Sequence, residues 1–173
     1  YHKDVVFATL IPAEEWLYDW YARCGYTQHI TCTPPPADVD SMDFDTFDRW
    51  QRSNPCIVLH DKEGFDIVKE DFRIAQAIDP DAKRQQNDIP SMIRIINAEM
   101  ALTLYAGCHP EKEENIRVYN DSDIPMNNIY FCIKKGKVTR TNYPLPDTRS
   151  LTIQELADYI FADDTLLMTL MLN

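Results

Sequence analysis

The sequence predicts an α+β fold, and three observations point to that class. Short apolar runs rich in β-branched residues, such as 5–11, are typical of buried strands. Longer stretches such as 65–77 place apolar residues at the spacing of an amphipathic helix. Proline and glycine separate these runs, as they do between folded elements. Hydrophobic residues make up 45% of the 173, enough for the core of one ordinary domain or two small ones.

The N-terminal segment predicts a strand, a short helix and a second strand. Pro12 ends the first strand, 5–11, because it has no N–H to donate to a sheet. Two glutamates then suit the positive end of a helix, which the apolar spacing predicts over 16–24. Gly25 is placed to end that helix, and 26–33 again has the composition of a strand.

The middle of the chain begins with the polyproline break at 34–36 and ends with a polar, breaker-rich stretch at 78–90, which we interpret as a domain boundary. The elements expected between them are an acidic loop at 37–45, a helix through 47–51 capped by Asp45 or Thr46, a strand at 56–60, a turn at 61–64 and a helix at 65–77.

The last part of the chain predicts a second mixed unit. Its expected elements are a strand at 92–96, a helix at 98–105 capped by Asn97 and ended by Gly107, a strand at 115–120, a hairpin of 128–134 and 137–142 across Lys135 and Gly136, a helix at 156–161 and an apolar tail at 165–173. That tail has two interpretations, a buried chain end or a final strand of the C-terminal sheet.

Charge and cysteine usage limit the classes of function. The formal charge is −11, which argues against nucleic acid as a partner and favours cationic ones such as amines. The five cysteines are scattered and contain no C-x-x-C pair, so we expect reduced thiols, a cytoplasmic location and no zinc site. Apolar runs are too short for a membrane-spanning helix, so no membrane partner is expected. The four histidines show no metal-ligand spacing.

The segment 20–26, WYARCGY, resembles a helix motif of the GNAT N-acetyltransferases, and the run LIPAE at 10–14 is similar to the Eis-type branch of that family. The competing interpretation is an ordinary αβ unit with a tyrosine-rich core helix. In the Eis branch a sterol-carrier-like domain follows the acetyltransferase, and the run MIRIINAEMALTLYA at 92–106 is similar to its start. The resemblance implies the C-terminal part of a GNAT core at 1–33, a connecting region at 34–90 and a sterol-carrier-like domain at 91–173.

The resemblance also implies a reaction and a set of site residues. The reaction moves an acetyl group from acetyl-CoA directly to a primary amine. Tyr21 matches the family's tyrosine near the thioester sulfur and is expected to protonate the leaving thiolate. Tyr18, one helical turn earlier on nearly the same face, is the second candidate for this acid and an expected contact of the cofactor. Pro12 and Ala13 are expected to contact the cofactor through the backbone. The terminal carboxylate of Asn173 is expected to act as the base, and a homo-oligomer is possible.

Two departures from the family pattern qualify this hypothesis. Glu14 stands where many members have an asparagine that contacts coenzyme A. The four glycines are also dispersed, so the sequence has no Gly-rich turn for the cofactor's pyrophosphate. We therefore expect further chain before Tyr1 that supplies this turn. The alternative function is a non-catalytic sterol-carrier-like module that binds an apolar ligand or organises an oligomer. A third class, an acidic mimic of nucleic acid, would need regular stripes of charge.

Overall fold

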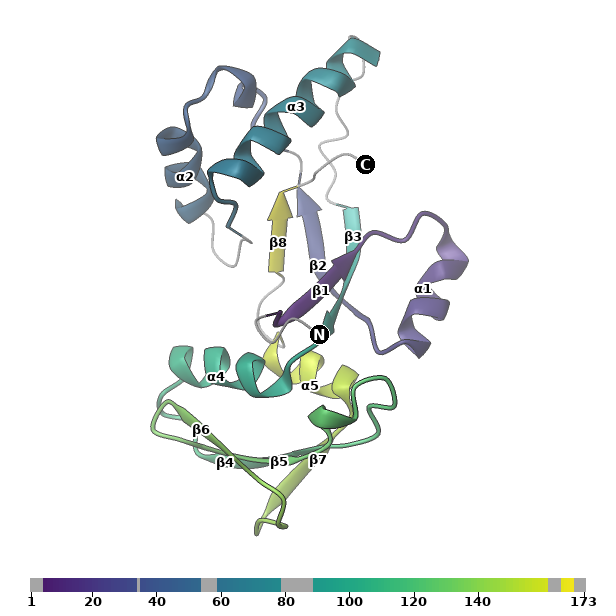
Figure 1. The fold of residues 1–173 in the computed structure, drawn as a ribbon, viewed down its shortest axis with the longest axis vertical. Helices are drawn as coiled ribbons and strands as arrows, with labels where there is room; N and C mark the ends of the chain where they lie inside the picture. Colours follow the sequence, from purple (N-terminus) through teal and green to yellow (C-terminus); the bar gives the residue numbers. More distant parts are fainter. Residues whose placement is uncertain (1–4, 34, 54–58, 79–88, 162–165, 170–173) are drawn as a thin grey trace. The chain divides into compact units, whose positions relative to one another are not determined.

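A computed structural model describes residues 5–33, 35–53, 59–78, 89–161 and 166–169, and it combines helices with strands, in agreement with the predicted class (Figure 1). The chain divides into two compact units, each assembled from two separate stretches of sequence. The first unit contains Tyr1–His29 and Met92–Asp163, and the second contains Ile30–Ser91 and Asp164–Asn173.

A four-stranded sheet is the centre of the first unit. Its strands are β4 (Glu114–Val118), β5 (Tyr130–Lys134), β6 (Lys137–Thr141) and β7 (Thr148–Leu151), in the order β6-β5-β4-β7. β4 and β7 run parallel, whereas the other neighbours run antiparallel. Helices α4 (Ala98–Cys108) and α5 (Ile153–Ile160) lie on one face of the sheet (Figure 1). The core between helices and sheet is apolar and includes Leu102, Ile116, Phe131, Ile133 and Leu156.

Local signals explain how these elements begin and end. Asn97 caps α4 by accepting a hydrogen bond from the Met100 N–H, as predicted. A capping box between Thr152 and Glu155 begins α5, earlier than the sequence interpretation placed this helix. The predicted hairpin is confirmed: Lys135 and Gly136 both have positive φ, the conformation that a two-residue turn between antiparallel strands requires.

The first unit also contains the predicted strand–helix segment. β1 (Phe7–Leu10) pairs antiparallel with β3 (Ile89–Ile95), from Phe7 opposite Ile95 to Leu10 opposite Met92. Helix α1 (Glu15–Arg23) follows, and Gly25 terminates it with a φ of 83°. The Gly25 N–H donates to the Ala22 carbonyl, and the Tyr26 N–H donates to the Tyr21 carbonyl. This pair of hydrogen bonds is the Schellman motif, a helix end that favours glycine.

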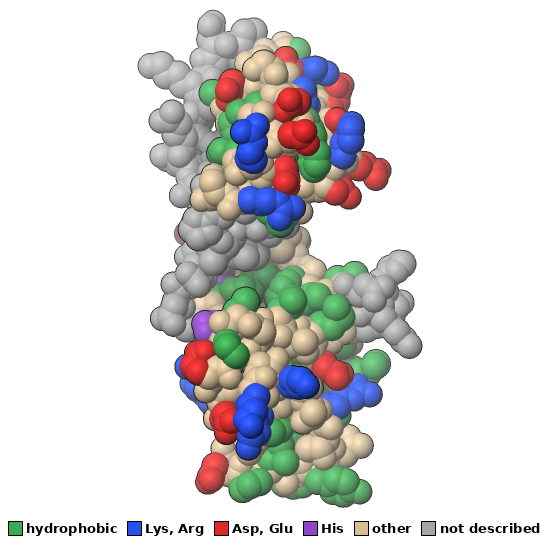
Figure 2. All heavy atoms as spheres, turned by 90° about the vertical axis from the view of Figure 1, so that its left-hand side faces the viewer, with side chains coloured by type: hydrophobic (Ala, Val, Ile, Leu, Met, Phe, Trp, Pro, Cys, Tyr) green, Lys and Arg blue, Asp and Glu red, His purple; other side chains and the backbone are tan. Residues whose placement is uncertain are grey.

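The second unit packs helices α2 (Phe44–Ser53) and α3 (Lys62–Ile78) with the short helix η1 (Val39–Ser41). Its core consists of Val39, Phe47, Phe65, Val68 and Phe72. On the face of this unit that Figure 2 shows, acidic and basic side chains are interspersed. In the same unit Arg52 pairs with Asp48 and Arg73 with Asp40. The charge here is therefore mixed rather than uniformly acidic, despite the net charge of the chain.

Strand β2 (Thr27–Thr33) begins in the first unit and continues into the second. There it pairs in parallel with β8 (Leu166–Thr169), from Ile30 opposite Leu166 to Thr33 opposite Thr169. Part of the predicted apolar tail is therefore a strand, as the second interpretation proposed. That interpretation was wrong about the sheet, because β8 pairs with β2 and does not belong to the sheet of β4 to β7. Asn173 lies outside the described residues.

Some predicted boundaries were wrong. Gly107 lies inside α4, which continues to Cys108, because a glycine near a helix end need not adopt positive φ. The predicted turn at 61–64 is the start of α3, where Asp61 accepts a hydrogen bond from the Gly64 N–H. Asp43, rather than Asp45 or Thr46, accepts from the third helical N–H of α2. Most of the strand predicted at 56–60 lies outside the described residues.

His60 gives the second unit a pH-dependent stability. Burial lowers the pKa of its imidazole, which lies 6.4 Å from the Phe47 ring, although the Asp61 carboxylate opposes the shift. Its Nε2 atom is buried and has no hydrogen-bond partner among the described residues. Below about pH 6.5 His60 binds a proton in the unfolded chain more readily than in the folded chain. Lowering the pH therefore favours the unfolded chain, and the folded state loses stability.

We expect the free energy of unfolding of the second unit to fall as the pH is lowered from 7.5 to 5, measured by urea unfolding with Trp50 fluorescence. His60→Phe removes the titrating group and should flatten this dependence. His109→Phe is the matched control, because the His109 side chain is 43% exposed and lies 3.7 Å from Glu111 in the other unit. An unchanged pH dependence in His60→Phe would contradict this assignment.

Candidate active site

The predicted site residues that the structure describes lie together on the segment from β1 to α1. Pro12 is buried and Ala13 is exposed in the loop between these elements. Tyr18 and Tyr21 follow on α1, three residues apart and both half-buried, so they share one side of the helix. The fifth predicted residue, Asn173, lies outside the described residues, so the structure does not place it relative to Tyr21.

The ring of Tyr21 is fixed by two aromatic neighbours. It lies edge-on to Trp20, with ring centroids 4.9 Å apart, and edge-on to Tyr26, with centroids 5.6 Å apart. Its hydroxyl, in contrast, forms no hydrogen bond with any residue in the described part of the chain. The ring is thus held while the phenol O–H remains available to a ligand.

Tyr26 adds a second phenol to this cluster. Burial raises the pKa of Tyr26, whereas the nearby guanidinium of Arg94 lowers it in part. At neutral pH Tyr26 is therefore a neutral hydrogen-bond donor beside Tyr21. Tyr26 is the last residue of the motif at 20–26, but nothing in the sequence indicated that it would pack beside Tyr21.

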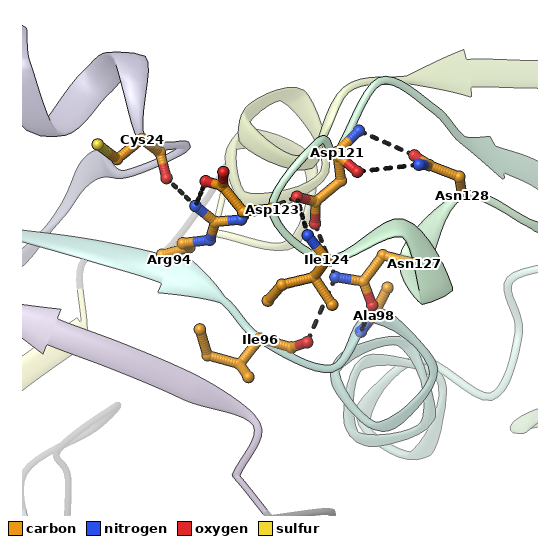
Figure 3. A network of polar contacts seen from close by, with 9 residues as sticks. All are labelled: Cys24, Arg94, Ile96, Ala98, Asp121, Asp123, Ile124, Asn127 and Asn128. Carbon is orange, nitrogen blue, oxygen red and sulfur yellow. Dashed lines mark hydrogen bonds and ion pairs between the residues drawn. The ribbon is translucent and has the colours of Figure 1, made fainter. Parts of the chain in front are cut away.

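The C-terminal end of α1 is fixed by side chains from far along the chain. Gln154 Nε2 donates to the carbonyls of Ala22, at 2.7 Å, and Tyr26, at 3.2 Å. Arg94 Nη1 donates to the carbonyl of Cys24 (Figure 3). These contacts give hydrogen bonds to carbonyls at and just beyond the end of α1, where the intrahelical N–H donors run out.

Arg94 is buried and neutralised by acidic residues of the loop after β4. Its Nη2 atom lies 2.8 Å from Asp121 Oδ1, and its Nη1 atom lies 2.7 Å from Asp123 Oδ2 (Figure 3). The side chains of Arg94 and Asp121 are only 7% and 1% exposed, whereas that of Asp123 is 59% exposed. We did not predict this pair, although an arginine inside the apolar run of β3 is a signal for a buried ion pair.

The outer side of α1 exposes large aromatic rings. Trp16 is 65% exposed and Trp20 is 50% exposed, one helical turn apart. No residue of α1 is fully buried, so the described residues cover the apolar side of this helix only in part.

A separate hollow of about 450 Å³ lies in the first unit, between the start of α4, the short helix η2 (Pro125–Asn127) and strands β5 and β6. Apolar side chains of Ile96, Ile129 and Phe131 line it. Arg140 and Glu99, which form an ion pair 3.2 Å long, also line it. Its size and lining suit a small amphipathic molecule.

The described part of the chain contains neither a membrane-spanning helix nor a cluster of metal ligands. None of its helices combines the length and the hydropathy that crossing a bilayer requires. Its histidine, cysteine and acidic side chains form no cluster of three or more that could hold a metal ion. The cysteines whose side chains are described, Cys24, Cys108 and Cys132, are free thiols.

No family model and no curated protein matches the sequence. Among solved structures, the chain is similar to Eis1 from Mycobacterium abscessus, with 12% identity and a TM-score of 0.46 over 90% of this chain and 63% of that one. It is also similar to a GCN5-related N-acetyltransferase from Anabaena variabilis, with 13% identity and a TM-score of 0.47 over 96% of this chain and 73% of that one. The chain therefore spans less than two thirds of the length of Eis1.

Proposed function

We propose that this chain is part of an N-acetyltransferase of the GNAT kind, which transfers an acetyl group from acetyl-CoA to a primary amine. The observation that carries the proposal is Tyr21: its ring is held by Trp20 and Tyr26, and its hydroxyl has no hydrogen-bond partner among the described residues. The motif 20–26 supports the assignment, because it puts this tyrosine on a short helix closed by Gly25.

In the proposed step the amine nitrogen attacks the carbonyl carbon of the acetyl thioester. A C–N bond forms, the C–S bond breaks and the electron pair leaves on sulfur. Tyr21 gives its phenol proton to the thiolate and regains a proton from solvent, while the amine loses its proton to a base, for which Asn173 is the predicted group. Pro12, Ala13 and Tyr18 are proposed to contact the pantetheine arm. The described residues contain no Gly-rich turn for its pyrophosphate, so the proposal requires another segment for that part.

The proposed partners follow from charge and composition. The net charge of −11 favours a cationic acceptor, and scattered cysteines support a cytoplasmic location. Residues 91–173 are proposed as a sterol-carrier-like domain. Homo-oligomerisation also remains part of the proposal.

The test uses the full-length protein that contains this chain. Acetyl-CoA is combined with polyamines, aminoglycosides and lysine peptides, and the released thiol is measured with a chromogenic disulfide. We expect turnover of at least one amine, with the acetylated product identified by mass spectrometry. Binding of coenzyme A without turnover of any amine would count against the proposal.

A second candidate is an apolar-ligand module, and the hollow beside α4 is the observation that favours it. In that case an amphipathic probe such as 1-anilinonaphthalene-8-sulfonate should bind the same protein and gain fluorescence. Ile129→Trp fills the hollow and should abolish this binding, whereas Leu104→Trp, at an exposed position of α4, should not. Equal probe binding in both variants would exclude the hollow as the site.

A further inference from the structure

The turn after α1 accepts a hydrogen bond from one strongly held cation. Arg94 Nη1 donates to the Cys24 carbonyl, and Cys24 belongs to the same turn as Tyr21. The N–H groups of Cys24 and Tyr26 both donate to the Tyr21 carbonyl, at 2.9 and 3.1 Å. A displacement of the Cys24 peptide would therefore move the backbone of Tyr21 and the Tyr26 ring that packs against it.

We infer that Arg94 is a positioning residue, which holds the end of α1 so that the Tyr21 hydroxyl points to the reacting group. The inference rests on the proposed acetyl transfer for its catalytic meaning. Arg94 itself does not touch substrate in this assignment. It acts through the Cys24 carbonyl and the turn.

Arg94 suits this role because its own position is fixed. Asp121 holds its Nη2 atom at 2.8 Å and is in turn held by the Ile124 N–H at 3.0 Å and by Asn127 Nδ2 at 2.9 Å (Figure 3). Asn127 Oδ1 also accepts from the Ala98 N–H at the start of α4. The guanidinium thus links the turn after α1 to the loop after β4 and, through Asp121 and Asn127, to α4.

The turn lies close to the guanidinium, which leaves little space for a side chain at Gly25. A Cβ atom added at Gly25 would lie 3.3 Å from Arg94 Cζ and 3.1 Å from a methyl group of Ile153. The planar guanidinium also presents several donors in fixed directions, so it can serve Cys24, Asp121 and Asp123 together. A lysine has a single ammonium group and cannot reproduce this geometry.

The matched control is Asn128, which supports the same network without touching α1. Its side chain accepts from the Asp121 N–H at 2.8 Å and donates to the Asp121 carbonyl at 2.9 Å. Asn128→Ala should therefore weaken the loop but leave the Cys24 carbonyl bonded to Arg94. A purely structural network would respond similarly to losses at either residue.

The experiment compares Arg94→Lys, Arg94→Met and Asn128→Ala in the full-length protein. Hydrogen exchange at the amides of 24–26 should rise at least about tenfold in both Arg94 variants, because a hydrogen bond from a charged donor is lost. It should stay within about twofold of the native rate in Asn128→Ala. With a responsive amine, kcat should fall roughly tenfold in Arg94→Lys with KM unchanged, the pattern of an interaction used in the transition state.

Hydrogen exchange can be measured without acetyl transfer. The acetyltransferase function and the positioning role of Arg94 can therefore be contradicted independently of each other. Absence of amine turnover in the native protein overturns the acetyltransferase, while exchange still tests the contact of Arg94 with the turn. Equal exchange in the Arg94 and Asn128 variants overturns the positioning role. Raised exchange with an unchanged kcat also overturns it. Arg94→Lys keeps the cation beside Asp121, so it provides the decisive result if Arg94→Met does not fold.

Discussion

Replacing Tyr21 by phenylalanine in the full-length protein should lower kcat by ~10²–10⁴, the usual contribution of a positioned general acid, with little change in KM. The phenyl ring keeps its edge contacts with Trp20 and Tyr26, so only the hydroxyl is lost. That hydroxyl has no partner among the described residues, so the free energy of unfolding should change by less than about 0.5 kcal/mol. Steady-state kinetics and urea unfolding measure the two quantities.

Tyr143→Phe is the matched control, because this tyrosine is 78% exposed in the loop after β6. It removes the same atom and should leave both quantities unchanged. Full activity in Tyr21→Phe would mean that the ring serves packing alone. The acid would then be Tyr18, three residues earlier on the same side of α1, or a bound water.

Replacing Asp121 by alanine should lower the free energy of unfolding of the first unit by ~3–5 kcal/mol, because it leaves Arg94 buried without its buried counter-charge. The change also removes the acceptor of the Ile124 N–H and of Asn127 Nδ2. Urea unfolding followed by the fluorescence of Trp16 and Trp20, both in the first unit, measures the loss.

Asp123→Ala is its control, since Asp123 binds the same guanidinium but is largely exposed. Exposed ion pairs contribute about 0–1 kcal/mol, so we expect a loss within that range. If both variants lost a similar free energy of unfolding, burial would not explain how strongly the Asp121 contact stabilises the unit.

The segment from β1 to the turn after α1 could be predicted from the sequence because its signals are local. Pro12 marks the end of the strand, and Gly25 has the positive φ that ends the helix. Asn97 and the turn at Lys135 and Gly136 were predictable for the same reason. Boundaries failed where several capping residues were available, as in the run that contains Asp43 and Asp45.

The contacts that fix the candidate site could not be predicted, because they join residues far apart in the chain. Arg94 could be suspected of an ionic partner, but nothing in the sequence selected Asp121 over the other acidic residues. The pairing of Gln154 with the carbonyls of Ala22 and Tyr26 has no sequence signal at all, since a carbonyl is present at every position. The structure shows that Arg94 and Gln154 contact the turn that follows Tyr21. The catalytic roles of Tyr21 and Asn173 stay predictions.

The pairing of β2 with β8 has a consequence for the order in which the protein folds during its synthesis. Strand β2 leaves the ribosome well before β8, because the parallel partner of Ile30 is Leu166. At ~5–20 residues per second, this edge of β2 waits on the order of ten seconds for its partner. Such late, long-range pairing slows folding and leaves backbone N–H and C=O groups exposed to other chains in the interval. A nascent-chain chaperone bound near residues 27–33 would shield that edge until synthesis reaches β8.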